Sequence, residues 1–428
     1  MKKIAVFALL FGLIVGMLPT MAAAYEFEEE FDMEYYGRFQ GQGISINVFN
    51  WGEYISDGSD DSLHVNQAFE ALTGIKVNYL TFANNEEMYS KLRGSGVSYD
   101  VIIPSDYMIS RMITENMLLP LNFDNIPAYQ NIDPQFVDTD YDPDNRYSVP
   151  YTWGTVGIIY NTTMVDPDDD METWDILWDE RYAGQILMFG NSRDAFGIAL
   201  KKLGYSMNPS DAQELEAALQ LLLEQKPLVQ AYVMDEIFDK MAGGEAAMAP
   251  YYAGDFITML EDNPDLAFAV PREGTNIFID AMCIPAGSQQ QEAAEIYINF
   301  MCEAEVAAAN IDFIGYSSPN AAAFELLDDE VREDQIRYPS NEVLDNTEFF
   351  LELPADLATL MDNLWISLLT GSGTGSASTN PGGDLNTPGG NTAPSSGNDW
   401  LMPAILVVLV LTVVVVIVMR GRAKKRDQ

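Results

Sequence analysis

The chain has 428 residues and a formal net charge of −43 at pH 7, with 65 acidic side chains against 22 basic ones. Such an acidic surface repels nucleic acid and anionic lipid headgroups, and it raises the local concentration of cations. The sequence holds one histidine and two cysteines, so zinc sites and histidine-dependent nucleophilic catalysis are nearly excluded.

The first residues have the pattern of a secretory signal. Two lysines precede an apolar run over residues 4–18, and three alanines at residues 22–24 offer a small-residue cleavage site. We therefore predict a signal peptide over residues 1–24. Residues 25–43 are acidic and aromatic without a period, which predicts a spacer.

Residues 44–150 alternate between strand-like and helix-like stretches. Strands are predicted at residues 44–50, 75–82 and 99–104, alternating with helices at residues 62–73, 86–93 and 107–117. This βαβαβα order predicts a parallel sheet with helices on its faces. In such sheets, ligands bind beyond the carboxyl ends of the strands.

A second region begins near residue 151. Strands are predicted at residues 157–160, 186–189, 246–249, 266–270 and 277–284. Helices are predicted at residues 211–225, 289–301 and 304–310, with a final helical segment over 340–369. The chain is long enough for two lobes, each with its own core.

The C-terminal residues predict a membrane anchor. Residues 371–399 are rich in Gly, Ser, Thr, Asn and Pro and read as a flexible linker. An apolar stretch without a charge follows within residues 400–419, and at ~1.5 Å per residue it has the length of a transmembrane helix. The basic residues in 420–428 predict a cytoplasmic tail, so we expect the binding domain to be displayed outside the cell.

Aromatic and acidic residues follow the predicted strands. Trp51, Glu53 and Tyr54 come after the first strand, and Ser105 and Tyr107 come after the third. A single aromatic at such a position is most simply a cap on the core, whereas two clusters at one edge favour a binding site. Rings beside carboxylates suit an organic cation, whose ammonium groups lie against ring faces while the acids accept its N–H donors.

Several motifs occur in the order found in a known family. They are Asn50-Trp51-x-Glu53-Tyr54-Ile55, Thr73-Gly74-Ile75-Lys76-Val77, Tyr99-Asp100-Val101-Ile102-Ile103-Pro104-Ser105 and Tyr147-Ser148-Val149-Pro150-Tyr151-x-Trp153-Gly154. The chain resembles the periplasmic spermidine/putrescine-binding proteins of polyamine ABC importers. The resemblance implies an α/β, two-lobed periplasmic-binding-protein fold, type II-like, with two crossovers and a hinge. One lobe would hold residues 44–150 with 277–320, and the other residues 151–276 with 321–370.

The resemblance also implies a ligand site between the lobes. One wall would consist of Trp51, Glu53, Tyr54, Ser105 and Tyr107. The opposite wall and the amine-binding carboxylates would be Asp194, Tyr252, Asp255, Phe278 and Asp280, with Tyr316 completing the pocket.

The sequence departs from the family pattern at three positions of this site. Asn191 stands where spermidine-type members have an acid, and Tyr251 and Phe278 stand where they tend to have Trp. Residues 252–255 instead reproduce the aromatic-x-Gly-Asp pattern of putrescine-type members. These differences favour the shorter diamine and leave spermidine open.

We therefore predict a monomeric, cell-surface substrate-binding protein that captures putrescine or spermidine and delivers it to ABC permease subunits. It would not be an enzyme and would need neither a catalytic residue, a cofactor nor a metal. A C-terminal helix would attach it to the membrane, and nucleic acid is not an expected partner. The alternative is a sensor, or an importer component, for another organic cation or a metal ion.

We expect structural roles, and no metal or ligand site, for the acidic runs at residues 138–145 and 168–170 and for the two cysteines. Residues 138–145 imitate a calcium loop, but Pro143 stands where the EF-hand needs Gly, so we expect a solvated connection. Residues 168–170 are expected to form a surface turn. For Cys283 and Cys302, buried free thiols are favoured, although the sequence leaves a disulfide open.

Overall fold

A mixed β-sheet runs through the part of the chain that the computed structural model describes, residues 27–28, 30–94 and 96–371. Its strands lie in the order β2 (Lys76–Phe82), β1 (Ser45–Trp51), β3 (Val101–Ile102), β9 (Thr275–Cys283), β4 (Ser148–Asn161), β7 (Met248–Tyr252), β5 (Ile186–Phe189) and β6 (Val229–Val233). Off this path, β10 (Thr347–Glu348) pairs with β9, and β8 (Leu266–Ala269) pairs with β4.

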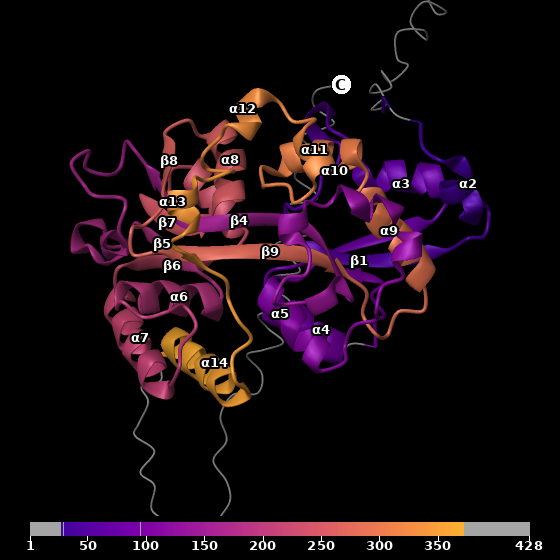
Figure 1. The fold of residues 1–428 in the computed structure, drawn as a ribbon. Coiled ribbons are helices and arrows are strands. Elements are labelled where there is room, and N and C mark those ends of the chain that lie inside the picture. The colour runs from indigo at the N-terminus through magenta and orange to yellow at the C-terminus, as the bar shows by residue number, and fades with distance from the viewer. Residues whose placement is uncertain (1–26, 29, 95, 372–428) are drawn as a thin grey trace, which may run out of the picture. The chain divides into compact units, whose positions relative to one another are not determined.

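Two strands, β4 and β9, pass from one lobe to the other (Figure 1). The first part of β4 pairs antiparallel with β9, and from Val156 onward β4 pairs with β7 of the second lobe. The carboxyl end of β9 returns to the first lobe, where Cys283 lies opposite Ile102 of β3. This two-lobed arrangement on a mixed sheet fits the predicted α/β fold.

In the first lobe, β1, β2 and β3 are parallel and helices cover both faces of the sheet (Figure 1). The helices are α3 (Val65–Thr73), α9 (Gln291–Met301) and α10 (Ala304–Ile314) on one face, and α4 (Asn85–Gly94) and α5 (Asp106–Thr114) on the other. Ile46 and Val48 belong to the core under the first group, whereas Phe49 belongs to the core under the second. Burial on both faces explains why the apolar residues of β1 do not simply alternate with polar ones: Val48 and Phe49 are consecutive and enter opposite cores.

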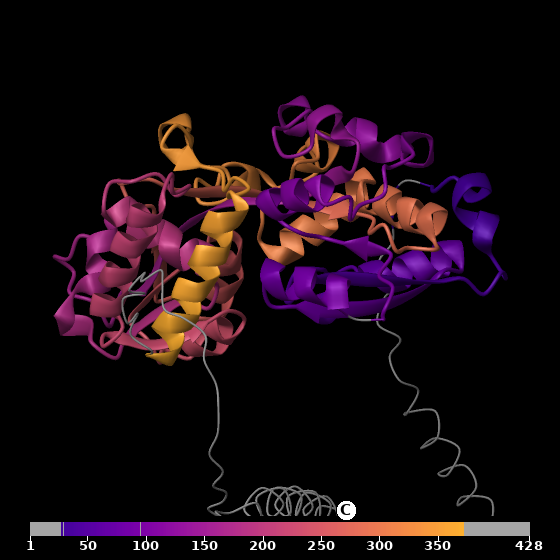
Figure 2. The ribbon, with the colours of Figure 1, turned by 90° about the horizontal axis from the view of Figure 1, so that it is seen from below.

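The second lobe buries a separate core. Its helices are α6 (Ser192–Lys202), α7 (Ala212–Gln225), α8 (Ala253–Asp262) and α14 (Ala355–Thr370). In Figure 2, α14 lies along the side of the second lobe that faces the first. The predicted helical segment over 340–369 is interrupted: α13 (Asn341–Leu344), β10 and an extended stretch precede α14. Pro354 is the N-cap of α14, and proline restricts the residue before it to extended backbone.

Residues 25–43 were expected to be a spacer, but the described residues of this segment pack on the first lobe. α2 (Met33–Tyr36) is capped by Asp32, and Tyr36 is only 2% exposed. The Tyr36 hydroxyl donates to Glu303 Oε1 at 2.5 Å, and its ring packs on Phe300. Interleaved aromatic side chains anchor the segment, and a helix of one turn is too short to show a period in the sequence.

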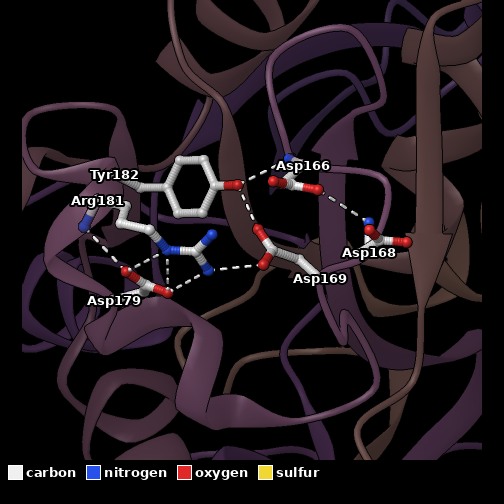
Figure 3. A network of polar contacts seen from close by, with 6 residues as sticks. All are labelled: Asp166, Asp168, Asp169, Asp179, Arg181 and Tyr182. Carbon is white, nitrogen blue, oxygen red and sulfur yellow. Dashed lines mark hydrogen bonds and ion pairs between the residues drawn. The ribbon is translucent and has the colours of Figure 1, made fainter.

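Most acidic residues of the two runs are exposed or half-buried, whereas Asp142 and both thiols are buried, so residues 138–145 are only in part the solvated connection that we expected. Asp142, inside the calcium-like loop, accepts hydrogen bonds from the backbone of the residues that lead into β4. Asp169 belongs to a network with Arg181 and Tyr182 (Figure 3). Cys283 and Cys302 are both buried and free.

The fold prediction included a transmembrane helix, and this part is corrected. Across residues 27–28, 30–94 and 96–371, no helix is long and apolar enough to cross a membrane. α14 has 16 residues and buries Leu364 and Leu368 against the second lobe while Ile366 is exposed, so its apolar side serves the core. The predicted membrane segment, 400–419, lies outside the described residues, as do the predicted signal peptide (1–24), the linker after residue 371 and the tail 420–428.

Candidate ligand-binding site

A cavity lies between the two lobes, beyond the carboxyl ends of β1 and β3. Its lining includes most of the residues that the sequence suggested: Trp51, Tyr54, Ser105, Tyr107, Asp194, Tyr252, Asp255, Phe278, Asp280 and Tyr316. Glu53 is the exception, because it is not among the lining residues. Both lobes and the crossing strand β9 therefore contribute side chains to one cavity.

The end of β1 supplies the first group. Trp51 is held by a 2.8 Å hydrogen bond from its Nε1 to the Ile103 carbonyl. Gly52 follows, and a Cβ at this position would lie 2.2 Å from the Asp235 carboxylate of the other lobe, so a larger residue here would displace the Asp235 side chain. Tyr54 is buried and donates to Asp280 Oδ2 at 2.7 Å.

Ser105 and Tyr107 stand where β3 leads into α5. The Tyr107 hydroxyl donates to Glu86 Oε1 at 2.9 Å, and Asn85 Nδ2 donates to both the Tyr107 and Ser105 hydroxyls. Asn85 and Glu86 begin α4, just beyond the carboxyl end of β2. This pair was not predicted as part of the site, although the same rule about strand ends points to it.

The second lobe contributes carboxylates from the first turns of two helices. Asp194 lies in α6, where the side chain of Asn191 caps the helix by accepting from the Asp194 backbone N–H at 2.9 Å. Asp194 Oδ2 accepts from the Tyr252 hydroxyl at 3.0 Å. Asp255 lies in α8, where the helix N-terminus favours negative charge.

A glycine lets an aromatic ring reach Asp255. A Cβ at Gly254 would lie 2.3–2.5 Å from three ring atoms of Tyr316. A rigid ring cannot yield at that distance, so Tyr316 packs directly on the backbone before Asp255. This contact is a physical reason for the glycine in the aromatic-x-Gly-Asp pattern.

The crossing strand β9 places Phe278 and Asp280 on one face. Phe278 lies opposite Gly154 of β4, and its ring is 5.3 Å from that of Tyr252. Asp280 is 4% exposed; Oδ2 accepts from Tyr54, Oδ1 is buried without a well-aligned hydrogen bond from a described residue, and the nearby Ser105 side chain lowers the pKa of the carboxyl. A buried carboxylate oxygen without a donor favours an incoming N–H group.

The electrostatics of the cavity follow from burial. Burial raises the pKa of Asp106 and Asp255 to about 8, and that of Asp194 and Asp280 to about 6. Neighbouring acids add to the rise, since Asp194 raises the pKa of Asp280 and Asp280 raises that of Asp255. Positive charge brought into this cavity would relieve the repulsion and return these groups to their ionised form.

The structure adds further lining residues that the sequence analysis did not assign to the site. They include Asn85, Glu86, Asp106, Asp235, Tyr251, Asn276 and Phe350. Asp106 accepts from the backbone N–H of Ile279, between Phe278 and Asp280, and so joins α5 to the ligand-facing part of β9. Its position between Ser105 and Tyr107 was a usable signal, whereas Asp235 and Phe350 follow no predicted strand.

The donor set of the cavity is a combination of carboxylates and aromatic rings. Among the residues that the structure describes, no group of three His, Cys, Asp or Glu side chains is arranged to hold a metal ion. The cavity can bind a cationic ligand whose N–H groups meet the acids and whose methylenes lie on the rings.

Two lobes, two crossing strands and an interlobe cavity define the class of two-lobed solute-binding proteins. The chain belongs to the family described as bacterial extracellular solute-binding protein, which it matches over residues 65–338. This is a family of transport-associated binding proteins and not of enzymes.

Relatives with a described ligand support the assignment. The chain is 34% identical over 306 residues to the spermidine/putrescine-binding periplasmic protein of Escherichia coli (strain K12), covering 71% of this chain and 86% of that protein. It is 27% identical over 350 residues to the putrescine-binding periplasmic protein PotF of the same organism, covering 78% and 90%. Among solved structures, the spermidine/putrescine ABC transporter substrate-binding protein PotD from Streptococcus pneumoniae is 37% identical, with a TM-score of 0.64 and coverage of 77% and 99%.

Proposed function

We propose that this protein captures polyamines, putrescine or spermidine, outside the cytoplasm and delivers them to the permease of an ABC importer. The observation that carries the proposal is the meeting of buried carboxylates and aromatic rings in one cavity between the lobes. The described ligands of the relatives support the same assignment. Both walls of the cavity come from one chain, so we propose that a monomer suffices for binding.

In this proposal the acids bind the ammonium groups and the rings hold the methylenes. Asp194, Asp255 and Asp280 come from different elements, so ammonium groups at several points of an extended ligand each find a carboxylate. Trp51, Tyr252, Phe278 and Tyr316 provide ring faces, and a desolvated cation on a ring contributes on the order of 2 kcal/mol. Glu53 would attract the ligand from a distance, because it stands outside the lining but raises the pKa of Asp255.

Ligand binding would be coupled to movement of the lobes. β4 and β9 connect the lobes, so bending within these strands would change the width of the cavity. Without a cation, bringing the acids of both walls together is opposed by repulsion and by loss of hydration. A polyamine removes this opposition and shifts the population toward the closed form by its differential affinity.

The test is calorimetric titration of the purified protein with putrescine, spermidine, spermine, arginine and calcium chloride. The proposal expects saturable binding of putrescine or spermidine with a dissociation constant in the micromolar range or below, which requires about 8 kcal/mol. Arginine and calcium should give no comparable heat. Saturable binding of calcium or arginine, with none of a polyamine, would overturn the proposal.

A further inference from the structure

Arg193 is a buried base directly behind two rings that line the interlobe cavity, those of Tyr107 and Phe350. It lies in α6 next to Asp194 and is 6% exposed. Its guanidinium carbon is 4.5 Å from the centre of the Phe350 ring and 5.2 Å from that of Tyr107. Its Nη2 donates to Asn208 Oδ1 at 3.1 Å and to the Leu351 carbonyl at 3.2 Å. Two rings and two acceptors therefore fix the position of this cation.

Arg193 stands at a boundary between two cavities. A second cavity, lined by Arg193, Glu352 and Asp362, continues between the lobes beyond the polyamine cavity. The two cavities share Glu86 and Tyr107, whereas Phe350 lines only the first and Arg193 lines only the second. The guanidinium, stacked on Phe350 and Tyr107, thus lies where the two cavities adjoin, on the far side of these rings from the first cavity.

The charge on Arg193 is permanent. Burial lowers its pKa, but a guanidinium stays protonated in proteins. At an effective dielectric constant of about 20, two like charges about 6 Å apart repel by enough to weaken binding more than tenfold. An ammonium group at Asp194 or Glu86 meets its carboxylate, whereas one that advanced further would meet the guanidinium instead.

We infer that Arg193, supported by Phe350, is the end stop of the polyamine cavity and restricts it to short polyamines. Putrescine and spermidine would end at Asp194 and Glu86, and the additional aminopropyl arm of spermine would be refused. The second cavity carries Glu115, Glu352 and Asp362 as well as Arg111, so the barrier to a longer ligand is the Arg193 guanidinium where the two cavities adjoin. This inference rests on the proposed function and assigns to it a determinant of ligand length.

The first test compares ligands on the unaltered protein. Spermine should bind at least tenfold more weakly than the better of putrescine and spermidine. Equal affinity for spermine would overturn the inference while leaving the proposed function intact. If no polyamine binds at all, the proposed function fails and the inference fails with it.

The second test changes the charge at the boundary. In Arg193→Met the ratio of spermine to putrescine affinity should rise by about tenfold, because the positive charge is lost. Arg193→Lys loses the planar guanidinium that stacks on the rings but keeps the charge. This variant should therefore retain most of the preference for putrescine over spermine. Arg111→Gln is the matched control, because Arg111 also lines the second cavity and carries the same charge, but it stacks on Tyr89 and pairs with Glu115. Equal ratios in the Met, Lys and unaltered proteins would overturn the inference, and thermal melts establish that each variant is folded.

Discussion

Acidic residues in two regions of the second lobe behave in opposite ways. In the surface network of Figure 3, Arg181 Nη2 lies 2.6 Å from Asp169 Oδ1 and 2.6 Å from Asp179 Oδ2. Hydrogen bonds from Tyr182 and Arg181 hold the pKa of Asp169 below its usual value. In the cavity, burial raises the pKa of Asp194 to about 6 and that of Asp255 to about 8.

The two groups of acids differ in whether a positively charged side chain lies close to them. The surface acids have a guanidinium of their own chain within hydrogen-bond distance, whereas the cavity gathers more acids than Arg193 can neutralise. The net charge of −43 is therefore no guide to which acids bind a ligand. The acids that matter are those buried without enough positive charge, and a polyamine supplies what they lack.

Removal of a cavity charge should have the largest effect. Asp280→Asn keeps the shape of a buried side chain but removes the charge that an ammonium group would meet, so putrescine or spermidine affinity should fall by about 30-fold or more. Calorimetric titration measures this change in affinity. Asp179→Asn, at the surface, is the control and should bind as the unaltered protein does; equal affinities in both variants would remove Asp280 from the site.

Polyamine affinity should depend on pH because cavity acids must ionise to bind an ammonium group. With pKa values of about 8 for Asp255 and about 6 for Asp194 and Asp280, affinity should rise by about tenfold or more from pH 6 to pH 8. Binding at pH 7 should release protons, which titrations in buffers of different ionisation enthalpy detect. A pH-independent affinity without proton release would contradict the raised pKa values.

The same groups determine how stability varies with pH in the absence of ligand. Their pKa values in the folded protein exceed the unfolded value of about 3.8, so between pH 4 and 8 the folded state binds more protons than the unfolded state. The contribution of these acids to the free energy of unfolding therefore decreases as the pH rises through this range. Surface acids with lowered pKa, such as Asp169, contribute stability above the unfolded pKa and lose it only at lower pH.

Two tyrosine–aspartate hydrogen bonds, one in the cavity and one at the surface, allow a matched comparison in which a smaller change in affinity is expected. Tyr252→Phe removes the hydrogen bond to Asp194 in the cavity and raises the pKa of that carboxyl further, so polyamine affinity at pH 7 should fall by about threefold to tenfold. Tyr182→Phe removes the equivalent bond to Asp169 at the surface. It should leave affinity unchanged, and a similar loss in both variants would point to a general effect on folding.

The smallest effect is expected for Arg181→Gln. The variant separates the surface acids from their cation, yet exposed ion pairs contribute little to stability. Polyamine affinity should stay within about twofold, and the melting temperature should fall by no more than about 2 °C. A loss of affinity comparable with that of Asp280→Asn would show that the two groups of acids are not independent.

Local patterns predicted most strands and helices of the first lobe, and most residues predicted for one wall, Glu53 excepted, line the cavity. β1 (Ser45–Trp51) and α9 (Gln291–Met301) lie within a few residues of their predicted positions, because apolar periodicity reports burial directly. Trp51, Ser105 and Tyr107 were predicted because residues after a parallel strand lie at a known edge of the sheet, and all three line the cavity. That reasoning needs only the order of elements along the chain.

Features that depend on distant contacts could not be predicted in this way. Asp235 and Phe350 reach the cavity from segments without a strand signal, and the N-terminal segment packs on Phe300 by way of a single helical turn. The predicted helix over 340–369 was divided, since β10 pairs with the distant strand β9.

Composition alone established an acidic protein suited to cationic partners, because charge can be counted without a fold. Which acids are left without a partner depended on the packing of the lobes. Asp169 and Asp194 are the same residue type, yet one lies beside Arg181 and the other is buried at the cavity. Ionisation depends on the dielectric and on neighbouring charges within a few ångströms, and residues far apart in the sequence supply both.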